Sequence, residues 1–293
     1  MKEMTSQATD DQRLPEGVET VEINGYPMAY LERGMGPTVV FVHGSLGDYR
    51  TWTPQTEALC KTFRVVAVSL RRAYPERWDG IGGGFSIEQH ALDVAAFIEC
   101  VGAPVDLVAH SRGGVVAVEV ARSRPELLRS LVLVEAGLDS LIRAENDASP
   151  DPVQRLASEV MQHFKSGGID EGLRHFTDTA NFAGAWDKLP EALKQRRRDN
   201  AWTLAAQANE RRPNFNCMDL GRLAMPVLMF VGELSTARNK AITAEMRRCL
   251  PGAQLVTMIG AAHSMITTHS ADFNAALSVF LRASGDLNTR SLP

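Results

Sequence analysis

The sequence predicts an α/β protein with a mostly parallel, doubly wound sheet and a helical cap insertion, and three observations support this fold class. Short apolar runs rich in β-branched residues recur along the chain without polar alternation, which is typical of strands buried on both faces. Segments with helical periodicity alternate with these runs. The stretch 139–222, by contrast, is rich in helix formers and contains no convincing strand pattern.

The first elements of the chain are expected to form a β-hairpin. Residues 18–23 and 28–31 are its two apolar runs, and Asn24-Gly25 between them is a typical turn sequence. Residues 1–15 are polar and acidic, so we expect a disordered tail there. Buried strands are then expected at 39–42, 65–68, 107–108, 131–134, 227–231 and 255–258. Ser86 and Gln89 have the spacing of a capping box and predict the start of a helix that includes residues 91–100.

The change of pattern along the chain predicts two units. Residues 16–138 and 223–285 are expected to form the sheet with its helices, and 139–222 a helical cap over the carboxyl edge of the sheet. The basic run 196–198 is interpreted as a solvated helix face and not as an anion site. The aromatic residues of the cap suggest an apolar substrate pocket, with ordinary packing inside the cap as an equal alternative; they include Phe176, Phe182, Trp186 and Trp202.

Charge and cysteine content limit the possible partners and compartment. The formal net charge of −4 gives no reason to expect nucleic acid or an anionic membrane as a partner. No apolar run approaches the roughly 18 residues that span a bilayer, and the polar N-terminus lacks a signal-peptide core. The four cysteines are widely spaced, which favours reduced thiols in a cytoplasmic protein. The seven histidines form no metal-binding pattern, and neither a metal nor a cofactor is expected.

Residues 109–113, Ala-His-Ser-Arg-Gly, are the most informative stretch of the chain. They lie between the apolar run 105–108 and a helical pattern that starts at Gly114, and small residues flank Ser111 at both i−2 and i+2. This is the pattern of a nucleophile elbow, in which a tight strand-to-helix turn tolerates only small neighbours. Such a turn exposes the serine hydroxyl beside the first free amides of the helix. Ser111 is therefore the candidate nucleophile.

A serine hydroxyl is a poor nucleophile at neutral pH and needs an adjacent base. His263 follows the last expected strand in the small-residue loop Gly260-Ala261-Ala262-His263. From there it can reach back over the carboxyl edge of the sheet to Ser111. His263 is therefore the candidate general base.

The oxyanion that forms in acyl transfer needs preorganised amide donors. His43-Gly44-Ser45 follows the strand expected at 39–42, so its backbone can point toward the same place as the elbow. The candidate donors are the amide of Ser45 and the amide of Arg112, which directly follows the nucleophile. The His43 side chain is expected to hold the shape of this loop.

These motifs together resemble the α/β-hydrolase superfamily. The resemblance rests on His43-Gly44 with Trp52 downstream, on the elbow at 109–113 and on the late Gly-Ala-Ala-His, and it spans roughly residues 18–283. Ala109 departs from the glycine that is usual at i−2. The resemblance implies the fold, a catalytic triad in the chain order serine, acid, histidine, and a helical cap.

The triad acid is where the chain departs from the commonest version of this superfamily. Most members place an aspartate three residues after the glycine that ends the strand expected at 227–231, and here that position holds Ser235. Serine cannot orient a histidine as a carboxylate does. Glu135 directly follows the run 131–134, a strand end at which some members carry the acid, and we favour it. Glu233 is the alternative acid.

A serine nucleophile predicts an acyl-enzyme and therefore a small-molecule ester or lactone as substrate. Thioester or amide substrates, a cofactor-free perhydrolase and a C–C bond hydrolase stay open on the same triad. A ligand receptor of this fold stays open as a second class, because the usual acid is missing. The sequence leaves open whether the chain is a monomer or a homodimer.

Overall fold

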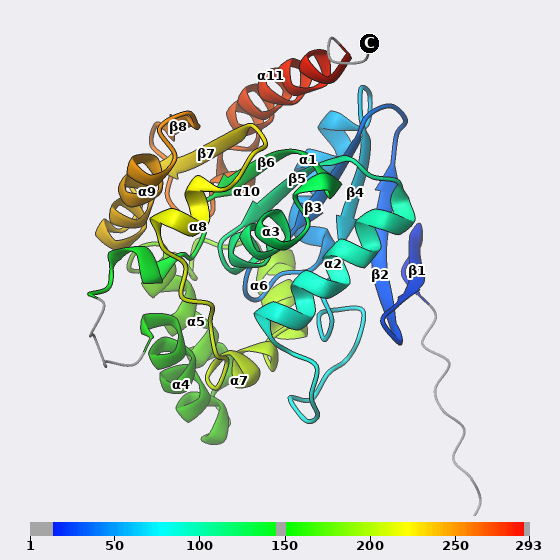
Figure 1. The fold of residues 1–293 in the computed structure, drawn as a ribbon. Coiled ribbons are helices and arrows are strands. Elements are labelled where there is room, and N and C mark those ends of the chain that lie inside the picture. Colours follow the sequence, from blue (N-terminus) through cyan, green and yellow to red (C-terminus); the bar gives the residue numbers. More distant parts are fainter. Residues whose placement is uncertain (1–13, 145–150, 290–293) are drawn as a thin grey trace, which may run out of the picture.

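The computed structural model describes residues 14–144 and 151–289, and its centre is one eight-stranded sheet (Figure 1). The strand order is β1-β2-β4-β3-β5-β6-β7-β8. β1 and β2 form an antiparallel hairpin, β2 runs antiparallel to β4, and the other neighbours pair in parallel. The strands are β1 (Val18–Ile23), β2 (Tyr26–Arg33), β3 (Thr38–Val42), β4 (Arg64–Val68), β5 (Val105–His110), β6 (Leu128–Val134), β7 (Val227–Gly232) and β8 (Gln254–Met258).

The predicted fold class is confirmed, and each apolar run singled out in the sequence lies on a strand of this sheet. Of the predicted tail, residues 1–13 lie outside the described residues. The helical elements are η1 (Tyr49–Trp52), α1 (Thr53–Leu59), α2 (Ile87–Val101), α3 (Arg112–Ser123), η2 (Pro125–Leu127), η3 (Asp139–Ile142), α4 (Pro152–Lys165), α5 (Ile169–Ala180), α6 (Glu191–Asp199), α7 (Thr203–Gln207), α8 (Cys217–Gly221), α9 (Ala237–Cys249), α10 (Met265–Thr268) and α11 (Ser270–Thr289).

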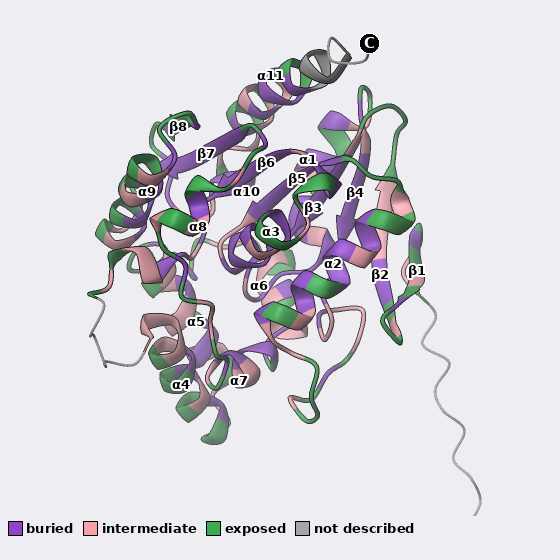
Figure 2. Cartoon of the chain, viewed as in Figure 1, coloured by how far each residue is buried: buried purple, intermediate pink, exposed green. Residues whose placement is uncertain are grey.

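The central strands are apolar on both faces because each face packs against helices (Figure 2). Along β3, Val40 and Val42 point into a core that α2, α3 and α9 complete. Val39 and Phe41 point to the opposite face, where α1, α10 and α11 cover the sheet. Side chains alternate between the two faces of a strand, so one short run supplies both cores.

The helices α4 to α7 have a small core of their own at the carboxyl edge of the sheet. Val160, Phe164 and Trp186 are buried in it, together with Leu46 from the turn after β3. In Figure 1, α4, α5 and α7 lie together beside one end of the sheet. The segment 139–222 therefore contacts the sheet at the edge where parallel strands end.

The cysteine prediction is wrong for two of the four residues. Cys217 and Cys249 form a disulfide, with their Cα atoms 4.8 Å apart, whereas Cys60 and Cys100 are free. The two cysteines are 32 residues apart in sequence, but α8 packs against α9, which brings them together. The expected cytoplasmic location loses the support that four reduced thiols gave it.

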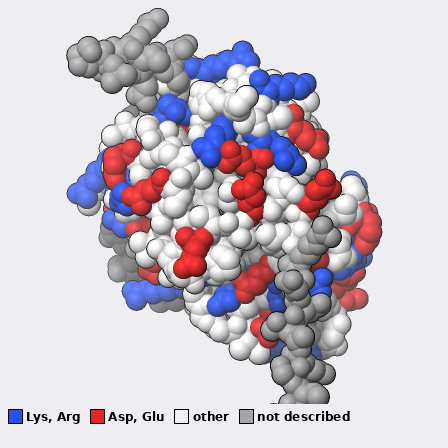
Figure 3. Space-filling view, turned by 90° about the vertical axis from the view of Figure 1, so that its right-hand side faces the viewer, with Lys and Arg blue, Asp and Glu red and all other residues white. Residues whose placement is uncertain are grey.

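The surface carries charges of both signs. On the face shown in Figure 3, acidic and basic side chains are interspersed, so this face has no extended patch of one sign. Among the described residues, no helix combines the length and the apolar composition that a bilayer crossing requires.

The long C-terminal helix allows a stability prediction. Phe273 on α11 is fully buried and packs against Phe230, while Val279 on the same helix is 72% exposed. Phe273→Ala should lower the free energy of unfolding by about 3–5 kcal/mol, because it opens a cavity under the sheet. Val279→Ala should change it by less than about 0.5 kcal/mol. Urea unfolding of both variants checks this, and equal effects would contradict the assigned packing.

Candidate active site

Ser111 occupies the turn between β5 and α3, in a strained backbone conformation. Its φ of 54° lies in the left-handed region, which is costly for a residue other than glycine. A Cβ at Gly113 would lie 2.4 Å from the carbonyl oxygen of His43, and one at Gly114 would lie 2.4 Å from the Cβ of Ala136. The helix therefore starts in a space that only glycine fits, and this close packing holds the serine at the tip of the turn.

His263 lies within hydrogen-bond distance of Ser111, as the sequence predicted. Its Nε2 atom is 3.1 Å from the Oγ atom of Ser111, and its Nδ1 atom is 2.7 Å from Oε2 of Glu135. With Nδ1–H donating to the carboxylate, Nε2 is free to accept the serine proton. The three side chains thus form a continuous chain of hydrogen bonds across the ends of β5, β6 and the loop after β8.

Glu135 is buried at the end of β6 and is held there by several donors. The amide of Gly232 donates to its Oε1 atom over 2.9 Å, and the hydroxyl of Ser235 donates to the same oxygen. The side chain of Asn239 donates to Oε2 over 2.7 Å. Burial alone would raise the pKa of this carboxyl, but the hydrogen bonds and the nearby imidazole of His263 outweigh burial and lower the pKa to about 2. The carboxylate is therefore ionised at neutral pH.

The residue at the usual acid position, in the loop after β7, forms a hydrogen bond to the acid at the end of β6. Ser235 stands where most members carry an aspartate, and its hydroxyl contacts Glu135. Asn239, on the first turn of α9, was not predicted; only its position soon after β7 could have indicated it. The alternative acid Glu233 is exposed and accepts a hydrogen bond from the amide of Gly260 over 2.8 Å. Its carboxylate is therefore engaged away from the imidazole of His263.

The turn after β3 lies directly beside the nucleophile. A Cβ at Gly44 would lie 2.8 Å from the Cβ of Ser111, so the two backbones approach as closely as glycine allows. The Nε2 atom of His43 accepts from the amide of Leu70 over 3.0 Å, which makes Nδ1 the donor to the carbonyl oxygen of Gly44 at 2.8 Å. Burial lowers the pKa of His43 to about 4, so this imidazole is neutral and holds the turn in shape.

Both predicted oxyanion donors border the same cavity as the nucleophile. Ser45 and Arg112 line it together with Ser111. Arg112 is the first residue of α3, so its amide has no acceptor within the helix. The side chain of Arg112 is buried and forms an ion pair with Glu210, with a further hydrogen bond to Nδ1 of His90 over 3.0 Å.

His110, directly before the nucleophile, is a second histidine at the site that the sequence reasoning missed. Its Nε2 atom donates to the carbonyl oxygen of His263 over 3.0 Å, and the two rings lie 4.6 Å apart. Burial and the proximity of His263 lower the pKa of His110 to about 3, so it is neutral. This hydrogen bond ties the loop after β8 to the elbow.

A cavity of about 520 Å³ opens above Ser111 and His263. Of the aromatic residues proposed for a substrate pocket, Phe176 lines it. The other three do not line this cavity: Trp186 is buried in the small core of α4 to α7, while Phe182 and Trp202 are 45% and 36% exposed. The aromatic spacing could not separate these positions, because the segment is folded into several short helices.

The run 196–198 is not a solvated helix face. Arg196 is only 8% exposed and Arg197 lines the cavity, whereas Arg198 forms ion pairs with Asp170 and Glu191 at the surface. Arg196 donates to the carbonyl oxygen of Arg50 over 3.3 Å. The start of the run is buried because α6 lies against η1, where Arg50 accepts from Arg196 and pairs with Asp199. A run of three basic residues does not reveal this contact.

Several known proteins resemble this chain in sequence or in fold. A soluble epoxide hydrolase of Corynebacterium sp. (strain C12) is 30% identical over 148 residues, which are 48% of this chain and 48% of that protein, so the match spans about half of that relative. The non-heme chloroperoxidase CPO-A1 of Kitasatospora aureofaciens is 28% identical over 284 residues, 88% of this chain and 97% of that protein. A thermophilic esterase of Thermogutta terrifontis superposes with a TM-score of 0.73 and 25% identity, covering 91% of this chain and 97% of the other. The model of the Alpha/beta hydrolase family matches residues 39–276, and the chain belongs to that family.

Proposed function

We propose that the protein is a serine hydrolase that cleaves a carboxylic ester or lactone through an acyl-enzyme intermediate. The observation that carries the proposal is the chain of hydrogen bonds from Ser111 through His263 to Glu135, with the serine at the wall of a cavity of small-molecule size. The family is one of hydrolases, and the esterase from Thermogutta terrifontis shares the fold over most of both chains.

In the proposed first step, the Ser111 oxygen attacks the substrate carbonyl carbon while Nε2 of His263 takes the hydroxyl proton. The ionised carboxylate of Glu135 holds the imidazole by Nδ1 and stabilises the imidazolium that forms. The tetrahedral intermediate carries a negative oxygen, which the amides of Ser45 and Arg112 stabilise.

His263 then returns the proton to the leaving alkoxide, which leaves the acyl-enzyme. The alcohol of an ester departs, whereas the hydroxyl formed from a lactone stays attached to the acyl chain. Water, activated by the same imidazole, attacks the acyl carbon and releases the carboxylic acid with Ser111 restored. We propose that the helices α4 to α7 act as a cap in this reaction, because residues of α4, α5 and α6 line the cavity above the triad.

Two other activities fit parts of the comparison. Epoxide hydrolysis on this fold needs a carboxylate nucleophile, and the corresponding residue here is Ser111, so the Corynebacterium relative does not favour that reaction. Formation of a peracid from an acyl-enzyme and hydrogen peroxide is the second candidate, because the chloroperoxidase relative matches 88% of this chain. Peroxide-dependent bromination of monochlorodimedone in the presence of acetate separates this activity from plain hydrolysis.

Replacing either Ser111 or His263 tests the proposed reaction. Ser111→Ala and His263→Ala should each lower kcat for p-nitrophenyl butyrate by about 10³-fold or more, because the nucleophile and its base act as one unit. Ser158→Ala, an exposed serine on α4, is the matched control and should keep full activity. Near-normal turnover by either triad variant, with an unchanged circular dichroism spectrum, would overturn the proposal.

The two candidate acids are separated by one pair of variants. Glu135→Gln keeps the shape of the side chain but removes the charge that holds His263, and should lower kcat about 10³- to 10⁴-fold. Glu233→Gln should change kcat less than about threefold, because its carboxylate contacts the backbone of Gly260. A large loss of kcat in Glu233→Gln together with a normal kcat in Glu135→Gln would reverse the assignment.

The charge of Glu135 also predicts how stability depends on pH. Its pKa of about 2 in the folded protein lies below the ordinary value of 4.5, so ionisation stabilises the fold. That contribution is fully present above the ordinary pKa and is lost as the pH falls toward the folded one. The difference in unfolding free energy between the wild type and Glu135→Gln should therefore shrink as the pH falls from about 5 to about 3 in urea titrations. A difference that stays constant over this range would show that the carboxyl has the same pKa in the folded and the unfolded protein, which would contradict the hydrogen bonds assigned to it.

A further inference from the structure

Among the described residues, no carboxylate forms an ion pair with either of two adjacent arginines on α6, Arg196 and Arg197. Arg196 is 8% exposed, and within residues 14–144 and 151–289 its Nε atom has no hydrogen-bond partner. Its guanidinium donates to the carbonyl oxygen of Arg50. Arg197 donates a hydrogen bond over 3.4 Å to the carbonyl oxygen of Leu193 on its own helix. Arg196 is buried and Arg197 is half-buried. A charge held away from water is costly to leave uncompensated, so this pair needs an explanation.

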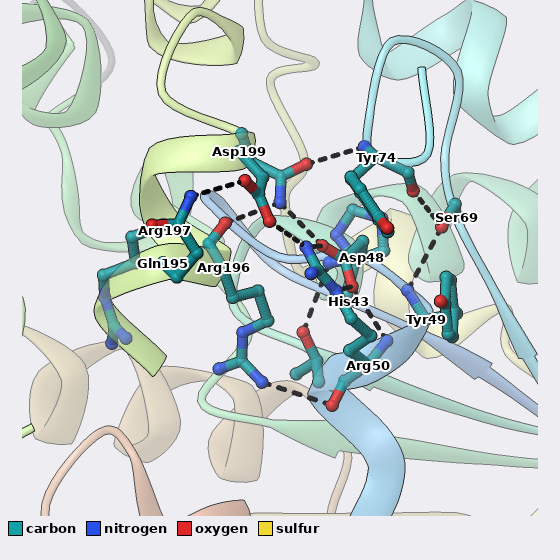
Figure 4. A network of polar contacts seen from close by, with 12 residues as sticks. His43, Asp48, Tyr49, Arg50, Ser69, Tyr74, Gln195, Arg196, Arg197 and Asp199 are labelled. Carbon is teal, nitrogen blue, oxygen red and sulfur yellow. Dashed lines mark hydrogen bonds and ion pairs between the residues drawn. The ribbon is translucent and has the colours of Figure 1, made fainter. Parts of the chain in front are cut away.

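The carboxylates nearby are already engaged with other cations. Asp48 and Asp199 both pair with Arg50. In Figure 4, the side chains of Arg196 and Arg197 leave α6 in directions away from Asp199. Burial is the larger cause, and repulsion from the charge of Arg196 the smaller, of a pKa of Arg197 that is lowered to about 9. A nearby anion would relieve this repulsion.

Arg197 faces the space in which a substrate would lie. It lines the same cavity as Ser111 and His263. Three other arginines in the cavity wall each pair with a carboxylate, since Arg112 pairs with Glu210 while Arg212 and Arg238 share Asp139. Arg155 also lines the cavity but is exposed, so water can solvate its charge.

We propose that Arg197 binds a carboxylate group of the substrate, so that the enzyme acts on carboxylate-bearing esters or lactones. The inference rests on the proposed function and names its substrate class. A guanidinium presents two parallel N–H donors that match the two oxygens of a carboxylate. The neighbouring charge of Arg196 adds to the positive potential around Arg197. The carboxylate of the bound substrate then supplies the negative charge that balances the two arginines.

A pair of substrates that differ in one charge tests this. Monomethyl adipate carries a free carboxylate and dimethyl adipate does not, while the ester that is cleaved is the same in both. The ratio of kcat/KM for the monoester to that for the diester should exceed one in the wild type. In Arg197→Gln this ratio should fall about tenfold or more, as expected for the loss of a charge-assisted hydrogen bond. Arg197→Lys should keep part of the preference.

Arg198→Gln is the matched control, because Arg198 lies on the same helix and its ion pairs are at the surface. The ratio in this variant should stay within about twofold of the wild-type ratio. A wild type without preference for the monoester, or an equal ratio in wild type and Arg197→Gln, would overturn the inference. A structural role for Arg197 predicts a lower melting temperature in Arg197→Gln, whereas removal of an uncompensated cation should leave it unchanged or raise it.

A binding measurement separates failure of this inference from failure of the proposed function. Monomethyl adipate should raise the melting temperature of Ser111→Ala but not that of Ser111→Ala/Arg197→Gln. Stabilisation of Ser111→Ala alone, without Ser111-dependent hydrolysis of p-nitrophenyl butyrate, would support the carboxylate site and contradict the hydrolase proposal. If hydrolysis is present and the stabilisation is the same in both variants, the carboxylate site falls alone.

Discussion

The carboxylate of Glu135 is the point on which the geometry of the site depends. It lies buried at the end of β6 and accepts hydrogen bonds from Gly232, Ser235, Asn239 and His263. These donors come from the end of β7, the loop after it, α9 and the loop after β8, so a single ionised group joins elements that meet at one edge of the sheet. An acid that is buried stays ionised only with such partners, and the low pKa of Glu135 follows from their number. The imidazole of His263 is thereby fixed in the orientation that leaves Nε2 free toward Ser111.

The sequence was sufficient for those parts of the site that local sterics and strand order determine. The elbow was predictable because Gly113 has no room for a Cβ. The sequence shows this constraint directly as small residues on both sides of Ser111. His263 and Glu135 were predictable because both follow apolar runs, and parallel strands bring such ends to the same edge. The absence of an aspartate at Ser235 pointed to β6 as the place of the acid, and the structure shows Ser235 itself as a donor to that acid.

The rest depended on contacts between segments far apart in the chain. Asn239 donates to Glu135, and His110 donates to the carbonyl oxygen of His263. Neither the spacing nor the type of these residues predicts the two hydrogen bonds. The disulfide of Cys217 with Cys249 follows from the packing of α8 on α9, which no cysteine spacing revealed. In residues 139–222, short helices change direction often, so an aromatic residue such as Trp186 faces a local core instead of the cavity. The same folding buries Arg196 and leaves its Nε atom without a hydrogen-bond partner among the described residues.

The most direct test of the account is mass spectrometry of the acyl-enzyme. The protein is mixed with p-nitrophenyl acetate, quenched in acid within the first turnover, digested and analysed by peptide. The account predicts the added mass of one acetyl group on the peptide that contains Ser111, and its absence in the Ser111→Ala protein. Rapid release of p-nitrophenol without an acetyl group on Ser111, or with the label on another residue, would contradict covalent catalysis by this serine.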